Sequence, residues 1–155
     1  MLKHVMVPLD GSQLAEDALE HAVNIVDPNG KITLIAAVDV PEIPVYGYLT
    51  TASTADFEAA TREMLPQART YLETVAKRIG NDRLTVVVDA QLGDAADVIT
   101  EMALKYKVDA IVMSTHGRSG LSRWLFGSVT NKVLSHHPCP VYVIPSKDKQ
   151  DNHAA

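Results

Sequence analysis

Cysteine is nearly absent from this chain. Cys139 is the single cysteine among 155 residues, so the chain can form neither an internal disulfide nor a thiolate metal cluster. A chain of this length buries roughly two-thirds of its unfolded surface, so one hydrophobic core can hold it together without such cross-links. We therefore expect a single domain over residues 1–147 and a flexible polar tail over 148–155.

Long apolar runs are also absent. No stretch approaches the roughly 18 apolar residues that a membrane-spanning helix needs. The N-terminus reaches Pro8 and Asp10 too early for the apolar core of a signal peptide. Together with the lone cysteine, these absences predict a cytoplasmic protein that does not insert into membranes.

Positive charge is scarce overall but not everywhere. Lys and Arg number 14 against 19 Asp and Glu, which gives a formal net charge of −5. Nonspecific nucleic-acid binding depends on cationic neutralisation of phosphates, so this composition argues against nucleic acid as a partner. Acidic residues, however, are missing from 110–147, which carries +4 while the rest of the chain carries −9. That segment indicates either a local anion site or a chance cluster of solvated charges.

The hydrophobic pattern alternates between strands and helices. Short apolar runs predict five strands, over 3–9, 31–38, 84–90, 109–114 and 140–145. Helical spacing of apolar residues predicts helices from an N-cap at Ser12 to the stop signal at 27–30, over 56–79, from an N-cap at Asp94 to about 106, and near 128–136. Residues 39–55 form the longest irregular stretch, and Pro66 is expected to kink or divide the second helix.

This alternation predicts an α/β fold. Strands joined by helical crossovers build a doubly wound, mostly parallel five-stranded sheet with helices on both faces. Such sheets bind ligands beyond the carboxyl ends of their strands, where the strand order reverses. The segments that follow the predicted strands are therefore the places to look for a binding site.

The loop after the fourth strand has the composition of a phosphate site. Gly117 follows the strand end, and Gly127-Ser128 opens the next helix, whose free N–H groups and dipole favour an anion. The hydroxyl groups of Ser114, Ser128 and Thr130 can add hydrogen-bond donors, and Arg118 or Arg123 can add charge. A plain strand–helix connector, with Ser128 as a helix cap, explains the same spacing about equally well.

Two familiar nucleotide motifs are missing. The chain contains no Gly-Lys-Ser or Gly-Lys-Thr triplet, which a Walker loop requires. Its first strand is followed by Pro-Leu-Asp-Gly-Ser rather than by the three glycines of a dinucleotide fingerprint.

The residues that remain resemble the small, single-domain universal stress proteins. The similarity runs from Val7-Pro8-Leu9-Asp10-Gly11-Ser12 to the last strand, Cys139-Pro140-Val141-Tyr142-Val143-Ile144. The family's nucleotide signature G-2x-G-9x-G-(S/T) appears here as Ser114, Gly117, Gly127 and Ser128, with its full spacing. Serine replaces the first glycine, and its hydroxyl can donate to a phosphate.

The resemblance implies a Rossmann-like fold, similar to that of adenine nucleotide alpha hydrolases, with ATP lying across the strand ends. Carried over by position, three segments would bind the nucleotide: Pro8, Leu9 and Asp10; Ala37 and Val38; and Met113, Ser114, His116, Gly117, Arg118, Gly127, Ser128, Val129 and Thr130. Mg²⁺ would accompany the triphosphate, and we assign no protein ligand to this ion. His116 would either donate to phosphate or brace the loop.

The resemblance also implies a homodimer, formed by antiparallel pairing of the last strand through Val141, Tyr142, Val143 and Ile144. The adjacent His136 and His137 lack a third metal ligand, and Asp94 and Asp97 need no role beyond helix capping. Trp124 and Phe126 would be a lid, a partner contact or loop packing.

No catalytic residue stands out. The leading interpretation is an ATP-binding regulator or sensor in the stress response, with slow or no hydrolysis. A protein that it regulates would be a further partner. The alternatives are a dimeric interaction module without nucleotide, which Ser114 favours, and a slow ATPase.

Overall fold

The structure is a computed structural model that describes residues 1–39, 51–115, 126–136 and 138–145. Its elements are, in chain order, β1 (Leu2–Pro8), α1 (Gln13–Ile25), β2 (Val26–Val38), α2 (Thr51–Ile79), β3 (Thr85–Leu92), α3 (Ala95–Tyr106), β4 (Ala110–Ser114), α4 (Ser128–His136) and β5 (Val141–Ile144). All five strands are parallel, in the order β3-β2-β1-β4-β5. The predicted doubly wound α/β fold is confirmed.

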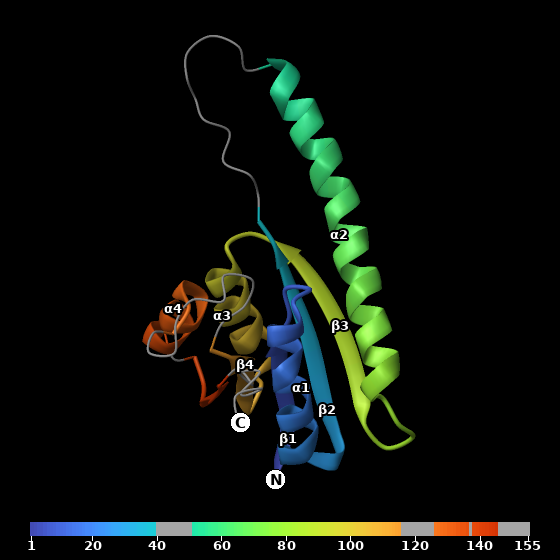
Figure 1. Cartoon of the computed structure of the whole chain (residues 1–155), viewed down its shortest axis with the longest axis vertical. Coiled ribbons are helices and arrows are strands. Elements are labelled where there is room, and N and C mark those ends of the chain that lie inside the picture. The colour runs from blue at the N-terminus through green and yellow to red at the C-terminus, as the bar shows by residue number, and fades with distance from the viewer. Residues whose placement is uncertain (40–50, 116–125, 137, 146–155) are drawn as a thin grey trace, which may run out of the picture.

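Helices cover both faces of the sheet (Figure 1), and an apolar layer lies under each pair of helices. On one face, α1 and α2 pack against a core built on Val5, Val7 and Leu34. On the other face, α3 and α4 pack against a core that includes Met6 and Ile35. Val5, Met6 and Val7 of β1 therefore point alternately into the two layers and are all fully buried, which explains why this part of the strand is an unbroken apolar run.

The second strand begins earlier than predicted. Residues 27–30 read as a stop signal, yet β2 starts at Val26, which pairs with Leu2 of β1. The register then shifts, because His4 pairs with Lys31, so residues 27–30 bulge out of the ladder between these two pairs. These residues do form a turn, since the Asp27 side chain accepts a hydrogen bond from the Asn29 amide at 2.9 Å. The turn lies within β2, however, and does not precede the strand.

The second helix also differs from the prediction. It begins at Thr51, not at 56, and Pro66 does not divide it. Pro66 lies on the exposed side of α2. Water can therefore reach the carbonyl group that the proline leaves without a donor, and the helix continues.

Both predicted N-caps are confirmed. The Ser12 hydroxyl accepts from the Ala15 amide at 3.1 Å. The Asp94 carboxylate accepts from the amides of Ala96 and Asp97 at 3.1 and 3.2 Å. The two caps place the N-termini of α1 and α3 at the carboxyl ends of the strands, next to the expected binding site.

Candidate functional site

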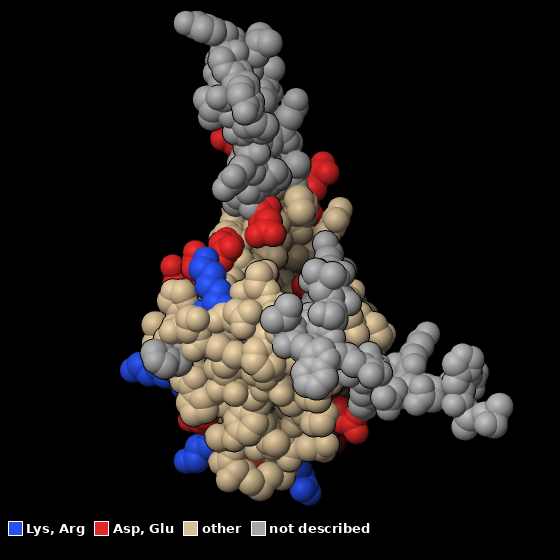
Figure 2. Space-filling view, turned by 60° about the vertical axis from the view of Figure 1, so that its left-hand side comes forward, with Lys and Arg blue, Asp and Glu red and all other residues tan. Residues whose placement is uncertain are grey.

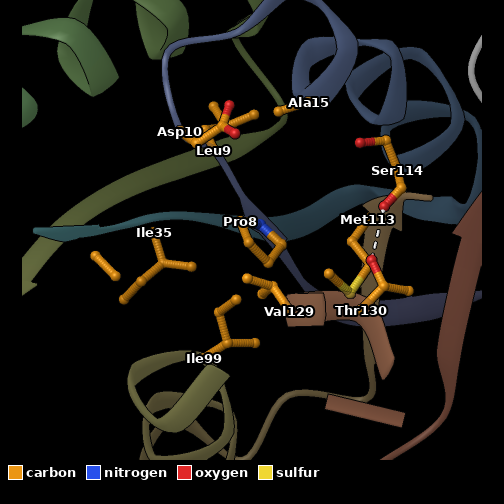
Figure 3. Close-up of a pocket in the computed structure, with 11 residues that line it drawn as sticks. Pro8, Leu9, Asp10, Ala15, Ile35, Ile99, Met113, Ser114, Val129 and Thr130 are labelled. Atoms are coloured by element: carbon orange, nitrogen blue, oxygen red, sulfur yellow. Dashed lines mark hydrogen bonds between the residues drawn. The ribbon is translucent and has the colours of Figure 1, made fainter. Parts of the chain in front are cut away.

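The structure has a pocket at the carboxyl ends of β1 and β4, the two strands between which the winding reverses (Figure 3). Its cavity volume is about 80 Å³, and the pocket opens to solvent. Residues from separate parts of the chain line it: Pro8, Leu9, Asp10, Ala15, Ile35, Ala37, Ile99, Met113, Ser114, Val129 and Thr130.

The end of β1 supplies a carboxylate to the rim of the pocket. The Leu9 amide donates to the Ile35 carbonyl at 2.8 Å, which ties the chain to β2 as it leaves the sheet. One oxygen of Asp10 then accepts hydrogen bonds from the Ser12 amide, at 2.9 Å, and from the Ser12 hydroxyl, at 2.5 Å. Gly11, between them, has a φ of 85°, which a side chain would disfavour. The Asp10 carboxylate is thus exposed but held in place.

The end of β4 supplies the opposite wall. Met113 and Ser114 are buried at 5% and 6% exposure. The hydroxyl of Thr130, on α4, donates to the carbonyl oxygens of Ser114 and Thr115 at 3.2 and 3.3 Å. These bonds hold the first turn of α4 against the strand end, so that Val129 faces the pocket (Figure 3).

The amides at the start of α4 are only partly available to a ligand. The Gly127 amide donates to the Thr115 carbonyl at 2.8 Å, so this expected phosphate donor is already used within the protein. The first helical bond runs from the Asn131 amide to the Gly127 carbonyl at 2.9 Å. The amides of residues 128–130 precede it and have no acceptor within the helix, as at any helix N-terminus. An anion can therefore bind to these three amides, but not to that of Gly127 in this conformation.

The structure separates the two residues expected at the end of β2. Ala37 lines the pocket, whereas Val38 does not. The Val38 carbonyl accepts a hydrogen bond from the Gly93 amide at 3.0 Å, so it is engaged with the start of α3. Side chains alternate along a strand, which directs that of Val38 into the other layer of the core. It is 6% exposed there.

Three residues that line the pocket were not predicted from the sequence. Ala15, Ile35 and Ile99 belong to apolar patterns that only indicate a core, and no motif marks them. Alternation along β2 would have found Ile35, since it lies two residues before Ala37 on the same face. Ile99 could not be found in this way, because it depends on how α3 packs.

Of the remaining predicted residues, His116, Gly117 and Arg118 lie outside the described part of the chain, as do Trp124 and His137. Phe126 is 48% exposed. Cys139 is half-buried beside the second core layer, and burial raises the pKa of its thiol. Among the described residues, no three His, Cys, Asp or Glu side chains are grouped as metal ligands.

Of the four cations in the acid-free segment 110–147, Lys132 is the one that lies in the described part of the chain. Lys132, from the acid-free segment, does not point an unpaired charge at the pocket, because its ammonium group contacts the carboxylates of Asp94 and Asp97 at 2.9 and 3.1 Å. In Figure 2, acidic side chains gather toward the upper part of the described surface. In the described part of the chain, anion binding would therefore rest on helix amides and hydroxyls rather than on a cationic surface.

Comparison with known proteins identifies the family. The model of the universal stress protein family matches residues 1–145. The universal stress protein MJ0531 of Methanocaldococcus jannaschii is 31% identical over 97% of this chain and 86% of its own length. The solved structure of the protein MJ0577, from the same organism, is 25% identical, covers 95% of this chain and 98% of that one, and superposes with a TM-score of 0.83.

Two further solved structures contain nucleotides. A universal stress protein family member from Arabidopsis thaliana has AMP bound; it is 19% identical, with 97% of each chain covered and a TM-score of 0.61. A universal stress protein in complex with cAMP is 23% identical, covers 94% of this chain and 98% of that one, and has a TM-score of 0.59. Within the described residues, no helix is both long and apolar enough to cross a membrane. A pocket at the switch point of a five-stranded parallel sheet, a family match over almost the whole sequence and the shared fold lead to one conclusion: this chain belongs to the universal stress protein family.

Proposed function

We propose that this protein binds ATP in the pocket between β1 and β4, and that it acts in the cytoplasm as a sensor or regulator of the stress response. The observation that carries the proposal is the convergence of three predicted segments on one pocket. Pro8–Asp10, Met113–Ser114 and Val129–Thr130 are far apart in the sequence and line the same space. The AMP and cAMP complexes of structurally similar family members support an adenine nucleotide as the ligand.

The chemistry of the pocket fits such a ligand. Ile35, Ala37 and Met113 offer apolar surface of the kind that a purine ring requires. The Asp10 carboxylate on the rim is an acceptor suited to ribose hydroxyls, and the first amides of α4 are donors suited to phosphate. In this arrangement the base would lie against the strands and the phosphates would lie at α4.

Hydrolysis is expected to be slow or absent. Asp10 is the only ionisable side chain among the described residues that line the pocket, and Ser12 already occupies one of its oxygens. A phosphoryl-transfer enzyme needs a group that positions the attacking water and cations that stabilise the transferring phosphoryl group. Mg²⁺ accompanying the triphosphate would be held by phosphate oxygens and water, as it often is in nucleotide sites.

Isothermal titration tests the proposal. Protein freed of nucleotide should bind ATP, ADP and AMP with one site per chain, and mass spectrometry of the protein as purified should detect an adenine nucleotide. Overnight incubation with ATP, followed by chromatography, should leave most of it intact. Absence of binding to all three nucleotides would contradict the proposal and favour the second candidate, a stress protein that acts as an interaction module. The buried Ser114, at the first glycine position of the family signature, favours that candidate.

We also propose that the protein is a homodimer paired through β5. This strand is an edge of the sheet and Tyr142 on it is 44% exposed, so its outer backbone groups and this side chain can meet a second copy. Light scattering at micromolar concentration should give twice the mass of 16.8 kDa. Tyr142→Lys should shift the mass toward that of the monomer, because two lysines would be brought together across the two-fold axis. A monomeric mass for the unmodified protein would rule out this assembly.

A further inference from the structure

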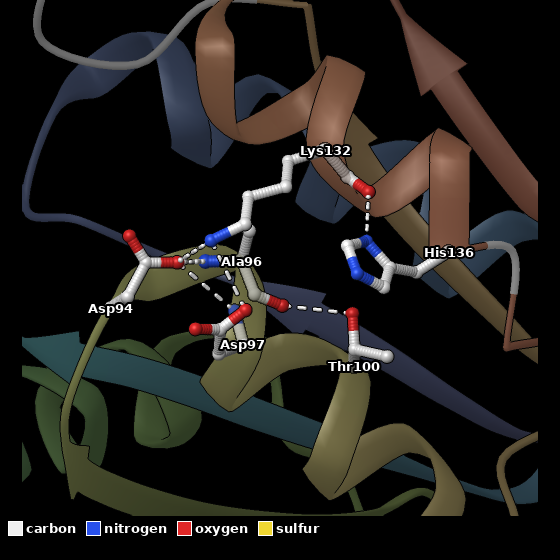
Figure 4. A network of polar contacts seen from close by, with 6 residues as sticks. All are labelled: Asp94, Ala96, Asp97, Thr100, Lys132 and His136. Carbon is white, nitrogen blue, oxygen red and sulfur yellow. Dashed lines mark hydrogen bonds and ion pairs between the residues drawn. The ribbon is translucent and has the colours of Figure 1, made fainter.

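A polar contact joins the two helices that form one side of the pocket. Lys132 on α4 reaches across to the start of α3, where its Nζ lies 2.9 Å from Asp94 Oδ1 and 3.1 Å from Asp97 Oδ1 (Figure 4). We call these three residues the α3–α4 clamp. Neither carboxylate nor the lysine lines the pocket, so the clamp lies beside the site rather than in it.

Hydrogen bonds within α3 hold the Asp94 carboxylate of the clamp independently of Lys132. Asp94 Oδ1 accepts hydrogen bonds from the amides of Ala96 and Asp97 as the N-cap of α3. Its neighbour Gly93 is tied to the end of β2 through the Val38 carbonyl. The hydrogen bond from Lys132 and the bonds from the two amides hold the pKa of Asp94 below its usual value, so the carboxylate is charged at neutral pH. Lys132 therefore attaches α4 to the carboxylate that caps α3.

The attachment lies close to the pocket in both helices. Lys132 follows Val129 by three residues, which is about one helical turn, and Val129 forms the α4 wall of the pocket. Ile99 forms the α3 wall, one to two turns after Asp94, and belongs to the same core layer as Val133 of α4. The distance between α3 and α4 therefore sets the space between the Ile99 and Val129 side chains.

We propose that Lys132 is a positioning residue for the nucleotide: through Asp94 and Asp97 it fixes the separation of α3 and α4, and thereby the width of the pocket, without contacting the ligand. The nucleotide in this inference comes from the proposed function, whereas the contact between Lys132 and the two carboxylates is observed in the structure. The side chains of Lys132, Asp94 and Asp97 are all exposed, so their effect on nucleotide affinity is modest and is screened by salt.

An uncharged ligand separates positioning from phosphate contact. Lys132→Met should weaken adenosine and ATP by the same factor, about two- to fivefold, which is the range measured for exposed ion pairs. Lys132→Arg, which keeps the charge, should restore most of the affinity. Raising the salt from 0.05 to 1 M should weaken adenosine binding to the unmodified protein but not to Lys132→Met, because adenosine itself carries no charge to screen. Lys105→Met is the matched control, since it removes the same charge from an exposed site near the far end of α3.

A measurement without ligand tests the clamp separately. The Asn131 amide donates to the Gly127 carbonyl in the first turn of α4, and its hydrogen exchange should be a few-fold faster in Lys132→Met than in Lys105→Met. Unchanged exchange would overturn the inference. So would a loss of ATP affinity with unchanged adenosine affinity, because Lys132 would then be a phosphate ligand. If the unmodified protein bound neither ligand, the proposed function would fail, and the exchange rates would still decide whether the clamp holds α4.

Discussion

Substituting aspartate for Val129 is expected to weaken ATP binding at least about a hundredfold, or about 2.7 kcal/mol. Val129 is half-buried and forms the α4 wall of the pocket, in the first turn of the helix. A carboxylate there would lose hydration when the nucleotide covers it, and it would repel the triphosphate. Two like charges about 4 Å apart near a protein surface repel by roughly 4 kcal/mol, which is enough to account for the loss.

Two further variants separate charge from shape. Ser135→Asp adds the same charge to an exposed position of the same helix and should leave the affinity within about twofold of the unmodified protein, because the charge is distant and screened. Val129→Asn has nearly the same shape as Val129→Asp without the charge, and it should bind adenosine as well as the aspartate variant does but ATP more tightly. Thermal melting of all three checks that the fold survives. Full ATP affinity in Val129→Asp would show that the nucleotide does not bind in this pocket.

Substituting alanine for Gly30 is expected to cost about 2–3 kcal/mol of unfolding free energy and to lower the melting temperature by roughly 5–10 °C. Gly30 is buried in the bulge at the start of β2. A Cβ atom there would lie 2.8 Å from the Asp27 carbonyl oxygen, 2.8 Å from the Val26 side chain and 2.9 Å from the Lys3 carbonyl oxygen. Two of the three neighbours are backbone atoms, so a rotamer change cannot relieve the clash.

Gly80→Ala is the matched control for this variant. Gly80 is exposed after the end of α2, and a Cβ atom there would meet one atom, the Ala76 carbonyl oxygen, at 3.0 Å. The melting temperature should change by no more than about 3 °C, as for a surface substitution of under 1 kcal/mol. Equal effects of the two substitutions, measured by calorimetry, would contradict the close packing around Gly30 in the bulge.

The fold could be predicted from sequence because its signals are local and agree with one another. The two N-caps, at Ser12 and Asp94, and the apolar runs of the five strands each correspond to an observed element. The errors arose where a local signal was overridden by its surroundings. Residues 27–30 have the composition of a turn and form one, but pairing of Val26 with Leu2 places that turn inside a strand.

The site was predictable to the extent that it follows strand ends. Asp10 follows the end of β1, and Met113 and Ser114 end β4; a parallel sheet brings these two strand ends together, so their common pocket follows from topology. Two contacts could not be predicted. One is the hydrogen bond from the Gly127 amide to the Thr115 carbonyl, and the other is the ion pair between Lys132 and Asp94. Both join residues that are distant in sequence, and neither contact has a motif.

The hydrogen bond from Gly127 to Thr115 makes two walls of the pocket behave as one unit. It fastens the residue before α4 to the residue that follows β4, and the Thr130 hydroxyl fastens the first turn of α4 to the same strand end. Any change that displaces α4 must therefore break these bonds or carry the end of β4 with it, so α4 can leave the sheet only as a whole.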